Sequence, residues 1–372
     1  MSSRQEDRVG ALRSFGASAS AIEELLASGE PPLRERDEPC DLPLAPELHI
    51  AVWEEYAAEA ASRGAWEVLQ SRLPPFWFPV STGISQTEGY RAATRRGASS
   101  RPSSGLALRC PEKLRLWVQG SLGGPIPVLA TAERADFVSL VQALSCRNEP
   151  EPLPGSMGAC LVAGLNNWDR IRQLRDRGLA EGGAAQTWPA ELRRIIPRTE
   201  LYQDRVLVLS EGPYSNIPAS DMGLSSDEWL RLSFAIRLAH ECTHYLALRL
   251  FGTVLDRPVD EVIADYVGVA AAFGRFRADW FLRFVGLEAF PNYHPGRRLE
   301  NYRGQPPLSD GAFQVLQALV RAAALNLERL DAEHFGDWQQ EQDRAWLAPA
   351  LSRLTLEEMA SPAFFKTIKQ GP

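Results

Sequence analysis

The chain has 372 residues, of which 45% are hydrophobic and 23% are charged. These proportions are typical of a protein with a packed core, and they exclude a wholly disordered, collagen-like or coiled-coil chain. The net charge of −7 offers no overall attraction to a phosphate backbone or an anionic membrane, so we expect no nucleic-acid and no membrane partner. At about 150 residues per domain, the length favours two domains.

Cysteine spacing and hydropathy indicate the compartment. The five cysteines are irregularly spaced, with no C-x-x-C pair, and are expected to be reduced thiols. Residues 1–10 are polar and lack the apolar run of a secretory signal. Charged and histidine residues interrupt the most apolar long stretch, residues 232–251, which argues against a membrane-spanning helix. We therefore expect a cytoplasmic protein.

The first part of the chain, residues 1–155, is predicted to be a mixed region whose role the sequence does not indicate. Residues 1–46 are expected to be partly mobile, apart from a helix over 20–28 that begins at a Ser20/Glu23 capping box. A longer amphipathic helix is predicted over 47–73, with a break at Gly64.

The rest of this region has weaker patterns. The aromatic segment 76–80 favours a buried strand or an extended lid, and the basic, Ser- and Gly-rich segment 91–115 favours a solvated loop followed by an edge strand. We predict strands over 114–119 and 126–130, a helix over 132–144, and a domain boundary at the proline-rich segment 148–155.

Beyond that boundary, residues 156–372 are predicted to form the second domain. Strands come first, and long helices follow toward the C-terminus, which is typical of the α+β class with a small mixed sheet. The predicted strands are 159–164 and 205–210, and the predicted helices are 166–178, 226–251, 258–273 and 310–333.

The segment His240-Glu-Cys-Thr-His244 is an H-E-x-x-H motif well inside the predicted helix 226–251. Two residues four positions apart are separated by about 40° around a helix axis and about 6 Å along it, so both imidazoles can bind one ion. Glu241 would lie beside such an ion, where a carboxylate can accept a proton from an activated water. The alternative is a buried helix whose histidines bind polar neighbours, but two such histidines would each need a buried partner.

A catalytic zinc site needs a third protein ligand and an open fourth position. Glu261 and Asp265 are four residues apart on the predicted helix 258–273, so one can bind the ion while the other accepts the free N–H of a ligating histidine. We favour Glu261 as the ligand over Asp260 and Asp256.

H-E-x-x-H on one helix, followed by E-x-x-x-D on the next, resembles the gluzincin branch of the zincin metallopeptidases over about residues 205–273. The resemblance implies a zincin-like catalytic domain with long active-site helices. It implies zinc ligands at His240, His244 and Glu261, a general base at Glu241, and a hydrogen bond from a ligating histidine to Asp265. The family also places an edge strand before the active-site helix to hold an extended substrate, and residues 206–216 occupy that place.

Further candidate residues lie in the loop 290–302 and at the end of the expected substrate strand. A histidine or tyrosine from this loop can stabilise an oxyanion, and an arginine can bind a substrate carboxylate or phosphate in bidentate fashion. The alternative is a proline-bounded surface loop. The candidates are His294 and Tyr293 for the oxyanion, and Arg297, Arg298, Tyr302 and Asn216 for substrate binding.

These features favour a zinc-dependent hydrolase of a peptide or small amide, with Glu241 as general base. Two alternatives stay open. A metal-dependent lyase, isomerase or biosynthetic enzyme could use the same ion on a small anionic substrate, or the metal could be structural in a protein that is not an enzyme. Two histidines and a carboxylate also suit Fe²⁺, although Zn²⁺ is favoured. The substrate and the oligomeric state are not predicted.

Overall fold

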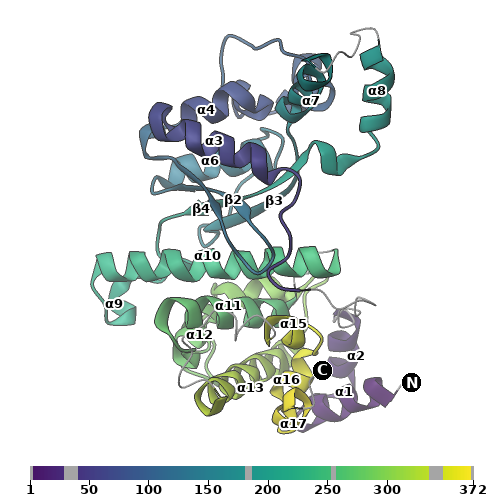
Figure 1. Cartoon of the computed structure of the whole chain (residues 1–372). Helices are drawn as coiled ribbons and strands as arrows, with labels where there is room; N and C mark the ends of the chain where they lie inside the picture. Colours follow the sequence, from purple (N-terminus) through teal and green to yellow (C-terminus); the bar gives the residue numbers. More distant parts are fainter. Residues whose placement is uncertain (1–2, 29–40, 181–186, 253–256, 335–346, 370–372) are drawn as a thin grey trace. The chain divides into compact units, whose positions relative to one another are not determined.

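The computed structural model describes residues 3–28, 41–180, 187–252, 257–334 and 347–369 (Figure 1). The chain forms two compact units, which we call the sheet unit (residues 45–212) and the helical unit (residues 1–44 and 213–372). Many helices and a small sheet of mixed strand direction make up the described residues, in agreement with the predicted α+β class. None of the described helices is long and apolar enough to cross a membrane.

The sheet unit is built around four strands in the order β1-β2-β4-β3. Strand β2 is antiparallel to β1 and parallel to β4, and β3 is antiparallel to β4. Strand β4 therefore lies inside the sheet, with hydrogen-bonded neighbours on both sides. The strands are β1 Arg115–Gln119, β2 Ile126–Thr131, β3 Ala159–Asn166 and β4 Gln203–Ser210.

A continuous apolar run explains why both faces of β4 are covered. Residues 206–209 are Val-Leu-Val-Leu and are all fully buried. Such a run is typical of a strand covered on both faces. Val206 and Val208 pack in one core with Trp53 of α3 and Phe137 of α6. The helices of this unit are α3 Ile50–Arg63, α4 Ala65–Arg72, η1 Pro74–Trp77, η2 Ile84–Gln86, α5 Glu88–Arg96, η3 Pro111–Lys113, α6 Arg134–Leu144, α7 Trp168–Ala180, α8 Trp188–Ile195 and η5 Thr199–Leu201.

A buried polar cluster joins α3, α7 and β4. Asp204 of β4 is fully buried and accepts hydrogen bonds from Trp53 Nε1 at 2.8 Å, Asn167 Nδ2 at 2.7 Å and Arg170 NH1 at 2.6 Å. Burial raises the pKa of Asp204 to about 6, although the Arg170 charge acts in the opposite direction. The carboxylate thus depends on its partners, because a buried charge without them is strongly unfavourable.

The helical unit combines both ends of the chain. The α1 and α2 helices contact α16 and α13, respectively, and Arg8 pairs with Glu357 at 2.9 Å (Figure 1). The helices are α1 Ser3–Ser14, α2 Ala19–Ser28, η6 Tyr214–Asn216, α9 Ala219–Met222, α10 Ser226–Phe251, α11 Pro258–Phe273, α12 Ala278–Val285, η7 Arg298–Arg303, α13 Asp310–His334, α15 Leu347–Leu351, α16 Leu356–Ala360 and α17 Phe364–Lys369.

The units divide the chain differently from the predicted boundary at 155/156. Strands β3 and β4 follow that boundary but pair in the same sheet as β2, so the chain up to Gly212 belongs with the sheet unit. The N-terminal residues instead join the C-terminal helices.

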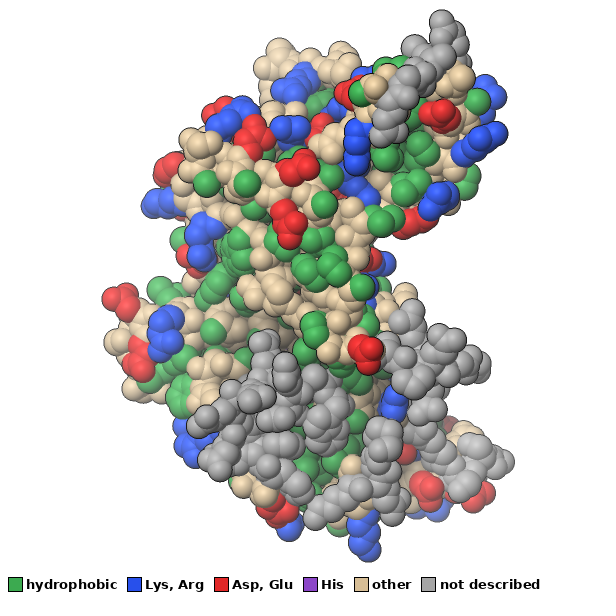
Figure 2. Space-filling model, in the orientation of Figure 1, with side chains coloured by type: hydrophobic (Ala, Val, Ile, Leu, Met, Phe, Trp, Pro, Cys, Tyr) green, Lys and Arg blue, Asp and Glu red, His purple; other side chains and the backbone are tan. Residues whose placement is uncertain are grey.

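On the face drawn in Figure 2, Lys and Arg side chains are interspersed with Asp and Glu.

Three local predictions were wrong. The first residues form α1 rather than a mobile segment, because α1 packs on helices far along the chain. The segment expected as a strand or lid at 76–80 begins inside the buried 3-10 helix η1, which Pro74 and Pro75 start. The expected loop at 91–115 begins inside α5, where Thr87 caps the helix by accepting a hydrogen bond from the Tyr90 backbone N–H.

Replacement of Asp204 by alanine is expected to destabilise the chain by about 3–5 kcal/mol, because Arg170 would stay buried without its charged partner. Urea denaturation of the purified chain measures this change. Asp176→Ala is the matched control, since Asp176 is exposed and pairs with Arg175 at the surface; it should change stability by less than about 0.5 kcal/mol. Equal effects of the two substitutions would contradict the role assigned to Asp204.

Candidate metal centre

Local signals at both ends define α10, the helix that carries the H-E-x-x-H motif. The Ser225 hydroxyl caps it by accepting a hydrogen bond from the Glu228 backbone N–H at 3.3 Å. Asp227 and Glu228 lie in the first turn, where negative charge is favourable, and the helix ends at Gly252 with φ of 78°. The motif therefore lies about one turn past the middle of a continuous helix, as predicted.

The second helix, α11, approaches α10 very closely at Gly268. A Cβ atom at this position would lie 2.7 Å from the Ile236 carbonyl oxygen of α10, closer than real Cβ contacts. Glycine is thus required for the two backbones to meet here. The contact brings the first turns of α11 against the histidines of α10.

Three side chains converge between these helices. The Nε2 atoms of His240 and His244 are 3.0 Å apart, and Glu261 oxygens lie 3.2 Å from His244 Nε2 and 3.7 Å from His240 Nε2. We call these three side chains the donor cluster. Their side chains are 6%, 12% and 14% exposed, so the cluster is largely shielded from solvent.

The spacing of the donor cluster fits one tetrahedral ion. Ligand atoms around zinc, with bonds of about 2.0–2.1 Å, lie about 3.3 Å from one another. The two Nε2 atoms are 3.0 Å apart and Glu261 Oε1 lies 3.2 Å from His244 Nε2, both close to this value, whereas the 3.7 Å to His240 Nε2 is measured from the other Glu261 oxygen, Oε2. The cluster can therefore hold a metal ion, and within the described part of the chain it comprises three protein donors.

The alternative ligands to Glu261 are placed differently. Asp260 forms a bidentate ion pair with Arg257, at 2.7 and 2.8 Å, and so its carboxylate is already bound. Asp256 lies outside the described residues. The structure thus brings Glu261, rather than Asp260, to the two histidines.

The other ring nitrogen of His240 has its own partners. Its Nδ1 lies 2.9 Å from Asp265 Oδ1 and 2.9 Å from the Tyr214 hydroxyl. Because Asp265 is a carboxylate, we assign the proton to Nδ1, which leaves the Nε2 lone pair directed at the donor cluster. This is the arrangement of histidine ligands in metal sites, and it places Asp265 in the position that the E-x-x-x-D spacing predicted.

Arg298, at the start of η7, contacts the residues that bind Nδ1 of His240. It pairs with Asp265 and donates hydrogen bonds to the Tyr214 hydroxyl at 3.1 Å and the Ser215 hydroxyl at 3.3 Å. Its Nε also lies 3.8 Å from a Glu261 oxygen. Arg298, which was predicted to bind substrate, is therefore already bound to side chains of the protein. Its positive charge offsets the negative charge of the carboxylates around the donor cluster.

Charge and burial set the protonation of the cluster. Burial lowers the pKa of His240 to about 3, with the charges of His244 and Arg298 acting in the same direction. Burial also disfavours charged His244, but its hydrogen bond to Glu261 and the surrounding carboxylates raise its pKa to about 9. Burial alone would raise the pKa of Glu261, yet His240, His244 and Arg298 hold it well below its usual range. A metal ion would thus compete with one proton on His244.

Glu241 is close to the donor cluster but is not part of it. Its negative charge raises the pKa of both histidines. Across the described ranges of the chain, no hydrogen bond or ion pair of its side chain is found. Its carboxylate is consequently available to accept a proton, unlike those of Glu261 and Asp265.

The remaining predicted residues are not brought to the donor cluster by any contact found within the described part of the chain. His294 is 54% exposed and its Nδ1 lies 3.2 Å from Glu288. The Tyr293 hydroxyl donates to the Arg297 carbonyl at 3.3 Å, and its ring packs on Phe313. The other predicted residues are Arg297, whose Nε is buried without a hydrogen bond, Tyr302, which lines a cavity of about 310 Å³ with Pro258 and Val259, and exposed Asn216 in η6.

The expected substrate strand over 206–216 was wrong. Its first half is the interior strand β4, whose backbone groups bond to β2 and β3, and its second half turns into η6. An apolar run cannot distinguish an edge strand from an interior one, because strand order depends on segments distant in sequence.

Tyr214 is the main residue that the sequence did not indicate. It is buried, its backbone N–H donates to the Ser233 hydroxyl at 2.9 Å, and its hydroxyl donates to Asp265 at 2.5 Å. Burial raises its pKa to about 12, which keeps the phenol protonated. The next two residues, Ser215 and Asn216, have positive φ values of 50° and 56° and form a strained turn. No local sequence pattern predicts this turn.

The chain belongs to a family of unknown function, DUF7005, whose model matches residues 10–363. No curated protein and no solved structure matches it. Any function must therefore be argued from the residues of the site.

The Gly268→Ala substitution is expected to separate α10 from α11, because the added methyl group would meet the Ile236 carbonyl. We expect a loss of about 1–3 kcal/mol in stability, as for other overpacked sites, and weaker metal binding. Gly311→Ala in α13 is the matched control, since its added methyl group meets nothing within 4 Å; it should be neutral or stabilising. Chemical denaturation compares the stabilities of the two variants. If Gly268→Ala were as stable as the wild type, glycine would not be required at this contact between α10 and α11.

The purified chain is expected to bind one Zn²⁺ per molecule, measured by elemental analysis after dialysis. His244→Ala should lose stoichiometric zinc because it removes one of three donors. His294→Ala removes a histidine that contacts Glu288 instead, and it should retain the metal. Retention of zinc by His244→Ala, or equal loss from both variants, would rule out the donor cluster as the binding site.

Proposed function

We propose that the chain is a zinc-dependent hydrolase of a peptide or small amide. The observation that carries the proposal is the combination of three converging donors from α10 and α11 with Glu241 of α10, a neighbouring carboxylate for which the described residues supply no partner. Structural zinc sites have four protein ligands, whereas catalytic sites have three and an open position. The three donors found in the described part of the chain support the catalytic alternative.

Zinc is the metal that best matches the donor set. Two imidazoles and one carboxylate are typical of catalytic zinc sites with histidine and glutamate ligands. A zinc ion held there would supply a Lewis acid that polarises a carbonyl and makes water more acidic. The site's resemblance to gluzincins, in the order of its two motifs, agrees with this choice.

Side chains around the ion would carry out the proton transfers and hold the ligands in place. Glu241 accepts one proton from the attacking water while the water oxygen forms a bond to the amide carbon. Glu241 then delivers that proton to the amide nitrogen as the carbon–nitrogen bond breaks. Asp265 and Tyr214 hold His240 in one tautomer and orientation, while Arg298 keeps Asp265 paired. His294 and Tyr293 stay candidates for stabilising the oxyanion, in a loop that would have to bring them to the substrate.

The arginine contacts argue against the alternative of a lyase or isomerase that acts on a small anionic substrate. That alternative used the arginine loop as the substrate anchor. Arg298 is 14% exposed and already bound to Asp265, Tyr214 and Ser215. Arg298 therefore supports the candidate metal centre instead of being free to bind a substrate.

Glu241→Gln is the test of the proposed base. The variant should retain zinc, because Glu241 is not in the donor cluster, and should lose about 10²–10⁴-fold in turnover on any amide substrate found in a peptide and amide panel. Glu228→Gln, on the exposed first turn of the same helix, should keep full turnover. Full turnover by Glu241→Gln would falsify the role of Glu241. Zinc that does not exchange, together with no turnover on the panel by the wild type, would support a structural metal instead.

A further inference from the structure

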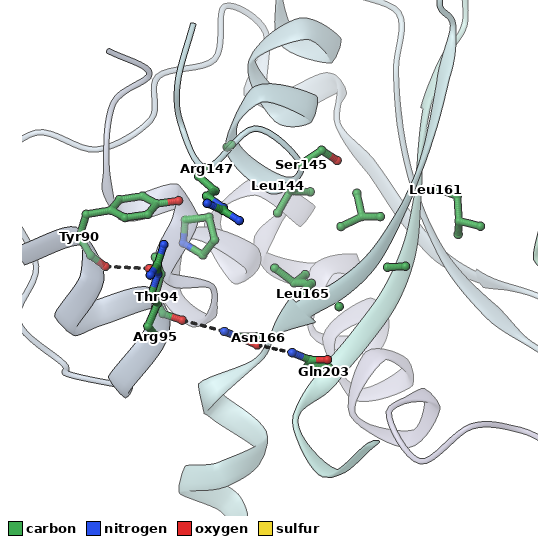
Figure 3. Close-up of a pocket in the computed structure, with 15 residues that line it drawn as sticks. Tyr90, Thr94, Arg95, Leu144, Ser145, Arg147, Leu161, Leu165, Asn166 and Gln203 are labelled. Atoms are coloured by element: carbon green, nitrogen blue, oxygen red, sulfur yellow. Dashed lines mark hydrogen bonds between the residues drawn. The ribbon is translucent and has the colours of Figure 1, made fainter. Parts of the chain in front are cut away.

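The sheet unit contains a cavity of about 760 Å³ (Figure 3). Helix α5, the C-terminal end of α6, and strands β3 and β4 line it. Pockets for small molecules typically have volumes of about 300–1,000 Å³, so the cavity is large enough for a ligand of metabolite size. Its residues all belong to the sheet unit, and so it is a different site from the donor cluster.

The cavity combines an apolar wall with an ordered polar edge. Leu144 and Leu165 supply apolar surface (Figure 3). At the polar edge, a hydrogen-bond chain runs from Gln203 Nε2 to Asn166 Oδ1 at 3.1 Å and from Asn166 Nδ2 to the Thr94 carbonyl at 3.1 Å (Figure 3). These side chains are held in place by protein contacts, so the edge is formed before any ligand arrives.

Two arginines give the cavity its charge. Arg95 and Arg147 line it, and the lining includes no Asp or Glu, although the chain as a whole has a net charge of −7. Neither side chain forms a hydrogen bond or ion pair within the part of the chain that the structure describes. By contrast, the next arginine on α5, Arg96, pairs with Glu88. The cavity thus presents two guanidinium groups whose donors are unused.

Arg95 and Arg147 both act electrostatically on the phenol of Tyr90, which lines the same cavity. Burial raises the pKa of Tyr90 well above its usual range, while the charges of Arg147 and Arg95 act in the opposite direction. The charges of both arginines thus reach the same buried side chain, where the Glu149 charge, the smallest of the three effects, opposes them.

A strained turn presents Arg147. Arg147 and Asn148 have φ values of 56° and 60°, which are unfavourable for residues other than glycine. The buried Asn148 amide holds the turn by donating to the carbonyls of Pro75 at 3.0 Å and Phe78 at 2.9 Å. Strain of this kind persists where surrounding contacts enforce it, and it often accompanies binding sites.

We propose that this cavity binds a small molecule with an apolar body and a carboxylate or phosphate group, and that Arg95 and Arg147 hold the anionic group. Arginine suits both anions because its planar donors match their oxygens. The leucine wall accommodates the apolar body. This inference does not depend on the metal centre and would stand if the proposed hydrolase activity failed.

Isothermal titration calorimetry on the full chain tests the proposal with octanoate, octyl phosphate, 1-octanol and inorganic phosphate as probes. Octanoate or octyl phosphate should bind, and whichever binds more tightly distinguishes a carboxylate from a phosphate ligand. Octanol and inorganic phosphate should each bind at least tenfold more weakly, because one lacks the charge and the other the apolar body. Absence of binding by both anionic octyl probes would overturn the proposal, as would equal binding of octanol or of inorganic phosphate.

Substitution locates the site. Arg95→Gln and Arg147→Gln should each weaken binding of the better probe by about tenfold to a hundredfold, the effect of losing a charged hydrogen bond. Arg96→Gln is the matched control on the same helix and should leave binding unchanged, because Arg96 does not line the cavity. Melting temperatures of the variants check that the fold is kept. A loss with Arg96→Gln equal to that with Arg95→Gln, or no loss with either cavity variant, would contradict the assignment.

Discussion

The candidate metal centre of the helical unit depends on the hydrogen bonds and the ion pair around the buried carboxylate of Asp265. It is fully buried, and it receives His240 from α10, Tyr214 from η6 and Arg298 from η7. A carboxylate without such partners would cost several kcal/mol to bury. These segments must therefore come together around α11, and the glycine contact between α10 and α11 makes the approach possible.

Three carboxylates at or near the donor cluster differ in their partners. Asp265 is bound by protein donors, Glu261 faces two imidazoles, and Glu241 has no partner within the described residues. The same residue type can thus orient a histidine, bind a cation or accept a proton, according to its environment. Arg298 offsets part of the negative charge, so the site can stay assembled while one carboxylate is left unpaired.

Predictions succeeded where the signal is local. Helices α10 and α11 were predicted with their bounds, because Ser225, Gly252 and Pro258 act within one turn of the helix ends. Helix α1 was missed because its contacts lie across the chain; Arg8 and Glu357 are 349 positions apart. The place of β4 in the sheet was missed for the same reason, since strand pairing joins segments that are distant in sequence, and the compact units divide the chain elsewhere than at 155/156.

The sequence by itself determined that His240 and His244 share one helix face, and that Glu261 and Asp265 share another, because helix periodicity follows from the backbone. It also placed Glu241 beside the pair. Only the tertiary structure decided which carboxylate faces both imidazoles, that Arg298 supports Asp265, and that Tyr214 completes the site. The same holds for the arginine-lined cavity, whose two guanidinium groups come from α5 and from a turn after α6. These choices depend on packing between separate segments, which no local pattern encodes.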